Sequence, residues 1–151
     1  MNNQNYTKTI TVNAKPTIAY QAISEEFEKW WTKPDCSIRK VGDRAKFSFP
    51  PGKTYWVFEA IELIPDKRVE LKCIEALHIF EGQPSKVEKE WLGSSIIFEI
   101  TQVNDSTTIR FEHIGLEPSM FCYDICEAGW NYFFVESLKL YLDTGSGKPY
   151  Q

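Results

Sequence analysis

The sequence predicts a single α+β domain in which a curved antiparallel sheet of about six strands wraps around a long C-terminal helix, with two short helices near the N-terminus. The first observation is the order of the periodic segments: one strand, two helical segments, a run of strands and a final helical segment. Consecutive strands favour antiparallel pairing, because parallel strands need long crossover connections. The second observation is that the final helical segment is apolar on more than one side, which is expected when a sheet covers it.

The length and composition are those of one globular domain spanning residues 1–151. Hydrophobic residues make up 42% of the chain and charged residues 25%, which separates it from disordered sequences. Aromatic residues reach 15% and include five tryptophans. Because such side chains bury large areas, either the core or an apolar pocket must be rich in rings.

Charge and motif content exclude several partners and cofactors. The net charge is −4 and no stretch gathers Lys and Arg, so we expect no nucleic-acid partner. No run approaches the roughly 18 apolar residues of a membrane span, and residues 1–11 are too polar for a secretory signal. We therefore expect no stable membrane insertion and a cytoplasmic location. The glycines at 145–147 lack the context of a phosphate loop, and no metal-ligand cluster occurs, so we expect no metal and no cofactor.

The four cysteines include no CxxC pair and are expected to be buried free thiols. Cys122 and Cys126 share one helix face, but a metal or redox site would need further ligands there.

The first three elements lie before residue 32. Residues 6–12 alternate polar and apolar side chains, which predicts a strand with one buried face. Pro16 favours the first turn of a helix that runs to Ser24, and residues 25–31 form a second short helical segment.

The middle of the chain predicts three strands. In residues 44–49 every second side chain is apolar, and a Pro-Pro-Gly turn at 50–52 ends this strand. A second strand spans 55–64 and ends in a tight turn at Pro65 and Asp66. A third covers 68–73, and residues 75–90 lose clear periodicity, which indicates an excursion from the sheet.

The last two strands form a predicted hairpin. Residues 96–101 and 109–113 both alternate, and turn-forming residues at 104–106 connect them.

The final helix is predicted over residues 119–142, with Thr144 and Gly145 marking its end and a flexible tail beyond. Two apolar stripes share this helix, and together they predict a helix embedded in the sheet. The first stripe consists of Trp130, Phe134, Leu138 and Tyr141. The second consists of Ile125, Ala128, Tyr132 and Val135.

This order of elements, together with short local strings, resembles the START-like (SRPBCC) superfamily of helix-grip folds. The subgroup it resembles comprises homologues of the activator of the 90-kDa heat-shock protein ATPase. The matching strings are Glu28-Lys29-Trp30-Trp31, Trp91-Leu92-Gly93-Ser94 with Phe98-Glu99-Ile100, His113-Ile114-Gly115-Leu116, Gly129-Trp130, and the ending Leu142-Asp143-Thr144-Gly145-Ser146-Gly147-Lys148-Pro149. The resemblance covers nearly the whole chain.

The resemblance implies an apolar cavity between helix and sheet, of the kind that this superfamily uses for lipids and other bulky molecules. Residues expected to bind the ligand are Trp31, Phe47, Phe98, Phe111, His113, Trp130, Phe134 and Leu138. Trp130, Phe134 and Leu138 would form the helix wall. Phe47, Phe98 and Phe111 would form part of the opposite wall.

His113 is the residue most open to a catalytic interpretation, because alternation places it on the face of Ile109 and Phe111. No acid–base partner stands at a fixed spacing from it, so we expect it to orient a ligand or a neighbouring element. No catalytic residue is predicted. His78, in the aperiodic stretch, is a weaker candidate.

Three functions follow, in this order: non-catalytic binding of a small apolar ligand, a chaperone-associated interaction domain, and a cyclase- or hydrolase-like enzyme using the same cavity. The activators that name the subgroup carry a separate chaperone-binding domain, for which these 151 residues leave no room. An apolar patch on the outer sheet face would favour the second function. A carboxylate converging on His113 would favour the third.

Overall fold

The structure is a computed structural model that describes residues 5–49, 54–77, 91–117 and 123–149. Within these residues the chain forms the α+β architecture that the sequence predicts. The elements in order are β1 (Tyr6–Val12), α1 (Pro16–Ala22), the 3₁₀ turn η1 (Phe27–Lys29), β2 (Arg44–Phe49), β3 (Thr54–Ile64), β4 (Arg68–Leu77), β5 (Ser95–Val103), β6 (Ser106–Ile114), α2 (Tyr123–Trp130), the π-helical segment η3 (Asn131–Leu138) and α3 (Lys139–Thr144).

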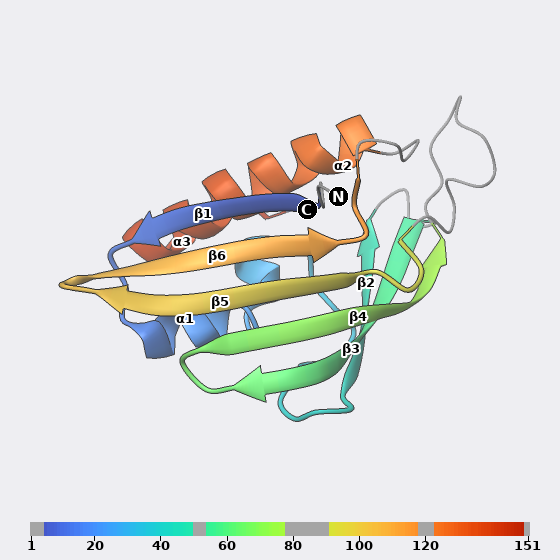
Figure 1. Ribbon diagram of the computed structural model, residues 1–151, viewed down its shortest axis with the longest axis horizontal. Coiled ribbons are helices and arrows are strands. Elements are labelled where there is room, and N and C mark those ends of the chain that lie inside the picture. The colour runs from blue at the N-terminus through green and yellow to red at the C-terminus, as the bar shows by residue number, and fades with distance from the viewer. Residues whose placement is uncertain (1–4, 50–53, 78–90, 118–122, 150–151) are drawn as a thin grey trace.

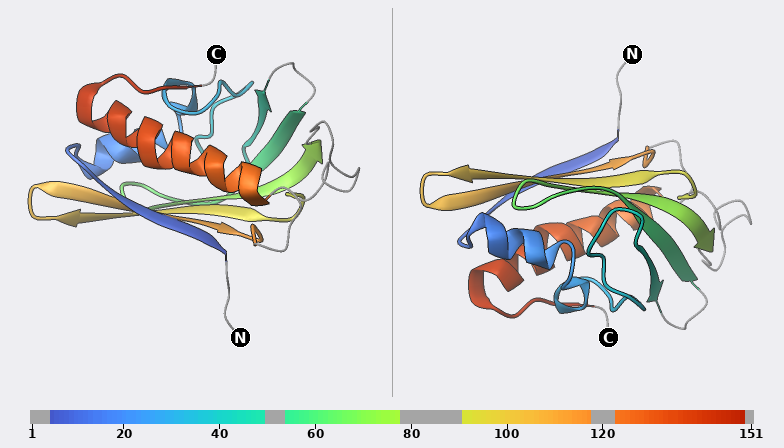
Figure 2. Two further views of the ribbon diagram at one scale, coloured as in Figure 1. Left: turned by 90° about the horizontal axis from the view of Figure 1, so that it is seen from above. Right: turned by 90° about the horizontal axis from the view of Figure 1, so that it is seen from below.

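One six-stranded sheet has the order β1-β6-β5-β4-β3-β2, and every pair of neighbouring strands is antiparallel. Figure 1 shows the strands curving so that β2 and β3 turn across the end of the sheet. Both views of Figure 2 place α1 and the C-terminal helix on the same face. The predicted fold class is therefore confirmed, with the helices on the concave face.

The hairpin turns use residues that tolerate a left-handed backbone. Asp66, between β3 and β4, has φ 66°, and Asn104, between β5 and β6, has φ 57°. Asp and Asn reach this region at lower cost than most residues. These turns fix the register, in which Phe98 pairs with Phe111 and both point to the concave face.

Strand β4 runs four residues beyond the predicted end at Cys73. The register with β3 shifts between Val57, which pairs with Glu75, and Phe58, which pairs with Cys73. This leaves Ile74 as an extra residue on β4. Because a bulge of this kind breaks the alternation of side chains, periodicity alone ended the strand too early.

The C-terminal helix spans 22 residues, from Tyr123 to Thr144, and ends two residues beyond the predicted boundary. Its central eight residues, Asn131–Leu138, are π-helical. The predicted start at residues 119–122 lies outside the described residues, as do the turn at 50–52, most of the predicted excursion with His78, and Cys122.

Only one of the two predicted apolar stripes faces the sheet. Trp130, Phe134 and Leu138 are buried, whereas Ala128 is exposed and Tyr132 is 41% exposed. The helix therefore lies on the sheet with one side covered. The prediction that both stripes are embedded was wrong for Ala128 and Tyr132, whereas Val135 packs against the core. Single apolar side chains at a surface are common, so the second stripe needs no cover.

The C-terminal tail is packed, contrary to the expectation of a flexible tail. Gly145 ends the helix with φ 90°, as a C-terminal glycine should. Lys148 N–H then donates to Ser137 Oγ at 2.7 Å, and the same hydroxyl donates to the Trp30 carbonyl at 2.7 Å. A Cβ at Gly147 would lie 2.5 Å from the Lys29 carbonyl oxygen, so only glycine fits where the tail crosses η1.

Candidate functional site

The side chains predicted to line a cavity gather in one interior between the helix and the sheet. All eight of them are buried. The ring of Phe134 lies 6.1 Å from that of Phe98 and 5.0 Å from that of Phe111, between ring centroids. Trp130 lies 4.6 Å from Phe111, and Trp31 lies 5.0 Å from Trp130.

Phe47, Leu138 and His113 are the remaining three residues of the set. The ring of Phe47, on β2, stacks on Trp31 at 4.6 Å. Leu138, from the π-helical segment, is fully buried in the same core. The rings of the predicted residues thus come from the C-terminal helix, from Trp31 after η1, and from strands β2, β5 and β6.

The five tryptophans of the chain form a continuous series of ring contacts through this interior. Trp30 contacts Trp31 at 6.1 Å, and Trp31 contacts Trp130 at 5.0 Å. Trp130 lies nearly parallel to Trp91 at 5.8 Å, and Trp91 stacks on Trp56 at 4.1 Å. Trp56 and Trp91 were not among the predicted site residues, although Trp91 belongs to one of the strings that carry the family resemblance.

His113 joins three parts of the interior by hydrogen bonds. Its Nδ1 accepts the indole N–H of Trp130 at 3.0 Å. Its Nε2 lies 2.9 Å from Ser94 Oγ, and the Ser94 hydroxyl donates to the Trp91 carbonyl at 2.6 Å. The imidazole therefore connects the helix to the turn before β5, while its own position is set by β6.

These partners determine the protonation state of the imidazole. An indole N–H can only donate, so Nδ1 must carry the lone pair and Nε2 the proton. The proton on Nε2 then points to Ser94, whose own hydrogen is directed to a carbonyl. Complete burial lowers the pKa of His113 to about 3, because the charged form loses its hydration. His113 is neutral at physiological pH.

The indole N–H groups of the interior differ in their partners. Trp30 donates to the Ala22 carbonyl at 2.7 Å, and Trp130 donates to His113. The Nε1 atom of Trp91 is buried, and the described residues offer it no acceptor.

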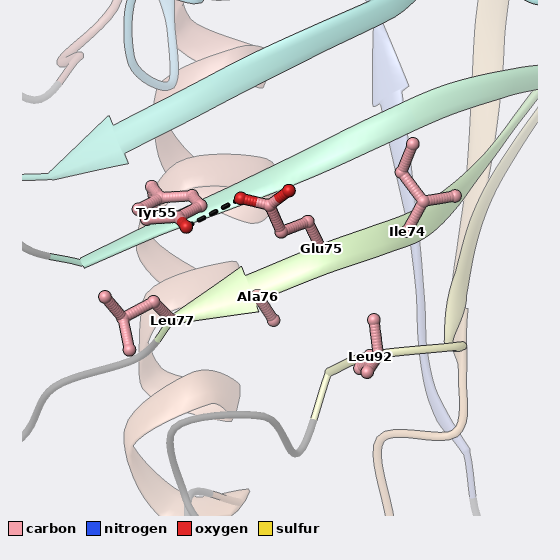
Figure 3. A pocket seen from close by; sticks show the side chains of 6 residues that line it. All are labelled: Tyr55, Ile74, Glu75, Ala76, Leu77 and Leu92. Atoms are coloured by element: carbon pink, nitrogen blue, oxygen red, sulfur yellow. Dashed lines mark hydrogen bonds between the residues drawn. The ribbon is translucent and has the colours of Figure 1, made fainter.

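The outer face of the sheet carries a pocket of about 460 Å³ on strands β3 and β4. Figure 3 shows the hydroxyl of Tyr55 bonded to the Glu75 carboxylate at its rim, at 2.6 Å. Ile74, Leu77 and Leu92 supply apolar side chains, and Leu92 is 48% exposed. The bulge leaves Ile74 as an extra apolar residue at this pocket.

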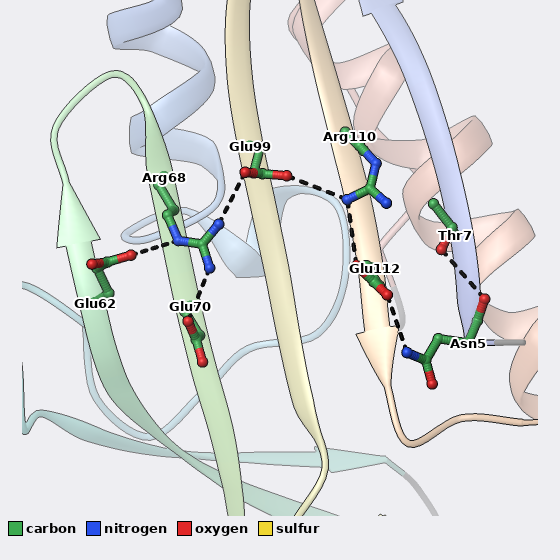
Figure 4. Close-up of polar contacts among 8 residues, drawn as sticks. All are labelled: Asn5, Thr7, Glu62, Arg68, Glu70, Glu99, Arg110 and Glu112. Carbon is green, nitrogen blue, oxygen red and sulfur yellow. Dashed lines mark hydrogen bonds and ion pairs between the residues drawn. The ribbon is translucent and has the colours of Figure 1, made fainter. Parts of the chain in front are cut away.

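A series of ion pairs lies on the outer face of β3, β4, β5 and β6, and is drawn in Figure 4. Arg68 on β4 contacts three carboxylates, those of Glu62 at 2.5 Å, Glu70 at 3.1 Å and Glu99 at 3.0 Å. Glu99 is shared with Arg110 on β6 at 3.3 Å. Arg110 also reaches Glu112 at 3.4 Å, so Glu112 points away from the interior.

The described residues show neither a metal-ligand cluster nor a membrane-spanning helix. They contain no group of three or more His, Cys, Asp or Glu side chains that could hold a metal ion. Cys73 and Cys126 are buried, but Cys36 is exposed, which corrects the expectation that the thiols are buried. Across the same ranges no helix combines the length and hydropathy of a membrane span.

A curved antiparallel sheet that holds a C-terminal helix over an aromatic interior defines a START-like, helix-grip domain. The chain belongs to the family described as Activator of Hsp90 ATPase homolog 1-like protein, whose model matches residues 13–143. The resemblance inferred from the sequence is therefore confirmed.

Solved structures agree with this assignment. The structure described as the Aha1 dimer from Colwellia psychrerythraea is 29% identical, with a TM-score of 0.75, and the match covers 95% of this chain and 98% of that one. A Mesorhizobium loti protein is 22% identical, with a TM-score of 0.67 and coverage of 86% and 92%. A Chromobacterium violaceum protein is 14% identical, with a TM-score of 0.70 and coverage of 93% and 98%. No protein with a curated description matches this sequence significantly.

Proposed function

We propose that this chain binds a small apolar or amphipathic molecule between the concave face of the sheet and the C-terminal helix, without catalysing a reaction. The observation that carries the proposal is the π-helical segment Asn131–Leu138, whose Phe134 and Leu138 are buried in the aromatic interior. π-Helical geometry is rare, and the single turns in which it mostly occurs are frequently found at functional sites. A π-helical segment of eight residues beside an interior of rings supports a binding role for this part of the helix.

The state of His113 supports binding over catalysis. A general base needs an accessible lone pair and a pKa near the working pH. The Nδ1 lone pair of His113 is taken by Trp130, Nε2 faces Ser94, and burial holds the pKa at about 3. A cyclase- or hydrolase-like activity would need a carboxylate at this imidazole, whereas its hydrogen-bonding partners are an indole and a hydroxyl. His113 is suited to holding the Trp130 indole and the Ser94 turn in a fixed orientation.

The second candidate function is a chaperone-associated interaction domain. The family match supports it, and so does the outer pocket, where Ile74, Leu77 and Leu92 interrupt a charged surface. The relative from Colwellia psychrerythraea is described as a dimer, so self-association is one form that such an interaction could take. Leu92→Asp should abolish a contact made through this pocket and leave ligand uptake unchanged.

Native mass spectrometry tests the proposed function. The protein is purified under non-denaturing conditions from the organism that produces it, and its mass is compared with that of the same sample after unfolding. We expect a small molecule to add to the folded mass and to be lost on unfolding. A folded protein that shows only the mass of the chain would contradict the proposal.

A further inference from the structure

The indole N–H of Trp91 is a buried donor for which the described residues provide no acceptor. Trp91 is only 4% exposed. Leaving such a donor unpaired costs about 1–3 kcal/mol, and unpaired buried groups are rare in native structures. By contrast, Trp30 and Trp130 both donate to the protein itself. An acceptor from outside the chain would remove this cost.

The protein holds the Trp91 ring in one orientation. The backbone carbonyl of Trp91 accepts a hydrogen bond from the Ser94 hydroxyl, and the His113 ring lies perpendicular to the indole, with ring centroids 4.5 Å apart and an interplanar angle of 86°. Trp56 stacks on it at 4.1 Å. Because ring and backbone are both fixed, the direction of the N–H is fixed before any ligand arrives. A donor organised in this way loses little entropy on binding.

The surroundings of Trp91 indicate which acceptor fits. The rings in contact with it are those of Trp56, Phe58, His113 and Trp130, and the imidazole among them is neutral. Burying an anion among uncharged rings costs far more than burying a neutral oxygen. The matching group is therefore a carbonyl, ether or hydroxyl oxygen rather than a carboxylate.

We propose that Trp91 Nε1–H donates a hydrogen bond to a neutral oxygen of the ligand and so selects amphipathic molecules over pure hydrocarbons. This inference rests on the proposed function, since it concerns the same interior. It assigns to Trp91 a role in specificity, while His113 and Ser94 position it.

Two probes of nearly equal shape test the proposal: 9-fluorenone, which carries a carbonyl, and fluorene, which carries a methylene at the same place. Spectra of ¹⁵N-labelled protein show one indole N–H signal for each of the five tryptophans. We expect fluorenone to move the Trp91 signal downfield and fluorene to leave it in place. A net hydrogen bond of about 1 kcal/mol corresponds to fluorenone binding about fivefold tighter.

Variants assign the effect to the N–H group. In Trp91→Phe the ratio of the two affinities should fall to about one. Trp30→Phe is the matched control, because its N–H already bonds to the Ala22 carbonyl, and it should keep the wild-type ratio. If Trp91→Phe fails to fold, the test rests on the Trp91 N–H signal of the wild type, which fluorenone should move and fluorene should leave in place.

The outcomes separate this inference from the proposed function. Equal binding of both probes with an unmoved Trp91 signal overturns the role of Trp91 and leaves the binding site standing. Magnetisation exchange from the Trp91 N–H to a bound water that fluorenone does not displace also overturns it, since water is then the acceptor. If the protein takes up neither probe, both proposals fail.

Discussion

The concave and convex faces of the sheet are built from alternate residues of the same strands, yet different forces hold them. On β3, Phe58 is fully buried among rings, while its neighbour Glu59 pairs with Arg44 at the surface, at 3.2 Å. Dense ring packing excludes water and contributes several kcal/mol per side chain. Exposed ion pairs contribute less than about 1 kcal/mol each. Stability and binding should therefore both depend on the concave face.

The largest difference in stability is expected between two variants on opposite faces of β3. Phe58→Ala removes a fully buried ring and should lower the free energy of unfolding by about 3–5 kcal/mol. Glu59→Gln, one residue away, should change it by less than about 1 kcal/mol. Urea denaturation measures both. Equal losses from the two variants would show that the two faces of the sheet contribute alike to stability.

A second test concerns what holds the helix over the concave face. Gly147→Ala should cost about 1–3 kcal/mol, because its Cβ would meet the Lys29 and Ser137 carbonyl oxygens at 2.5 and 3.1 Å. Gly129→Ala is the control, since it lies inside α2 with open space around it and should stabilise by up to about 1 kcal/mol. Thermal unfolding compares the two. A tolerated Gly147→Ala would show that the tail is not packed.

The third prediction uses pH. The folded-state pKa of His113, about 3, lies below the usual unfolded value near 6.5, so only the unfolded chain takes up this proton between these values. Stability from this group is present above pH 6.5 and is lost as pH falls. Between pH 7.5 and 5 the loss should be about 2 kcal/mol. His113→Gln should remove this dependence, and an unchanged pH profile would show that the imidazole is not buried in its neutral form.

The smallest loss of stability is expected from a variant on the convex face. Glu99 bridges Arg68 and Arg110, so Glu99→Gln removes the central carboxylate of the ion-pair series. The loss should be about 0.2–1 kcal/mol at low salt, and added salt should shrink it, because exposed pairs are screened. Denaturation at two salt concentrations measures it. A loss above 2 kcal/mol that ignores salt would mean that this face also carries the stability of the fold.

Strand alternation predicted most of the fold, because one face of each strand is buried. The strands at 6–12 and 44–49 were predicted with their observed boundaries. The end of β4 was missed, because the bulge at Ile74 breaks the alternation on which the prediction rests. The π-helical segment was missed for a related reason: Trp130, Phe134 and Leu138 are buried at the same four-residue spacing as in an α-helix.

Residues of the candidate site could be predicted from the sequence only where they lie on regular strands or helices. Periodicity placed Phe98, Phe111 and His113 on the concave face. It could not identify Trp91, which lies in a turn and meets Trp130 across 39 positions of sequence. The tryptophan in the Trp-Leu-Gly-Ser string was the available signal, but the unpaired N–H that singles it out exists only in three dimensions.

The most direct test is a titration with the neutral fluorescent probe N-phenyl-1-naphthylamine, made on the wild type and on Phe134→Ala. The wild type should take up the probe, and Phe134→Ala should bind it at least about fivefold more weakly while remaining folded. A side chain that lines a site loses fewer contacts on truncation, so Phe134→Ala should also cost clearly less stability than Phe58→Ala. If the wild type takes up no probe and Phe134→Ala costs the full 3–5 kcal/mol of a packed core, the interior is filled by its own side chains and the binding proposal is wrong.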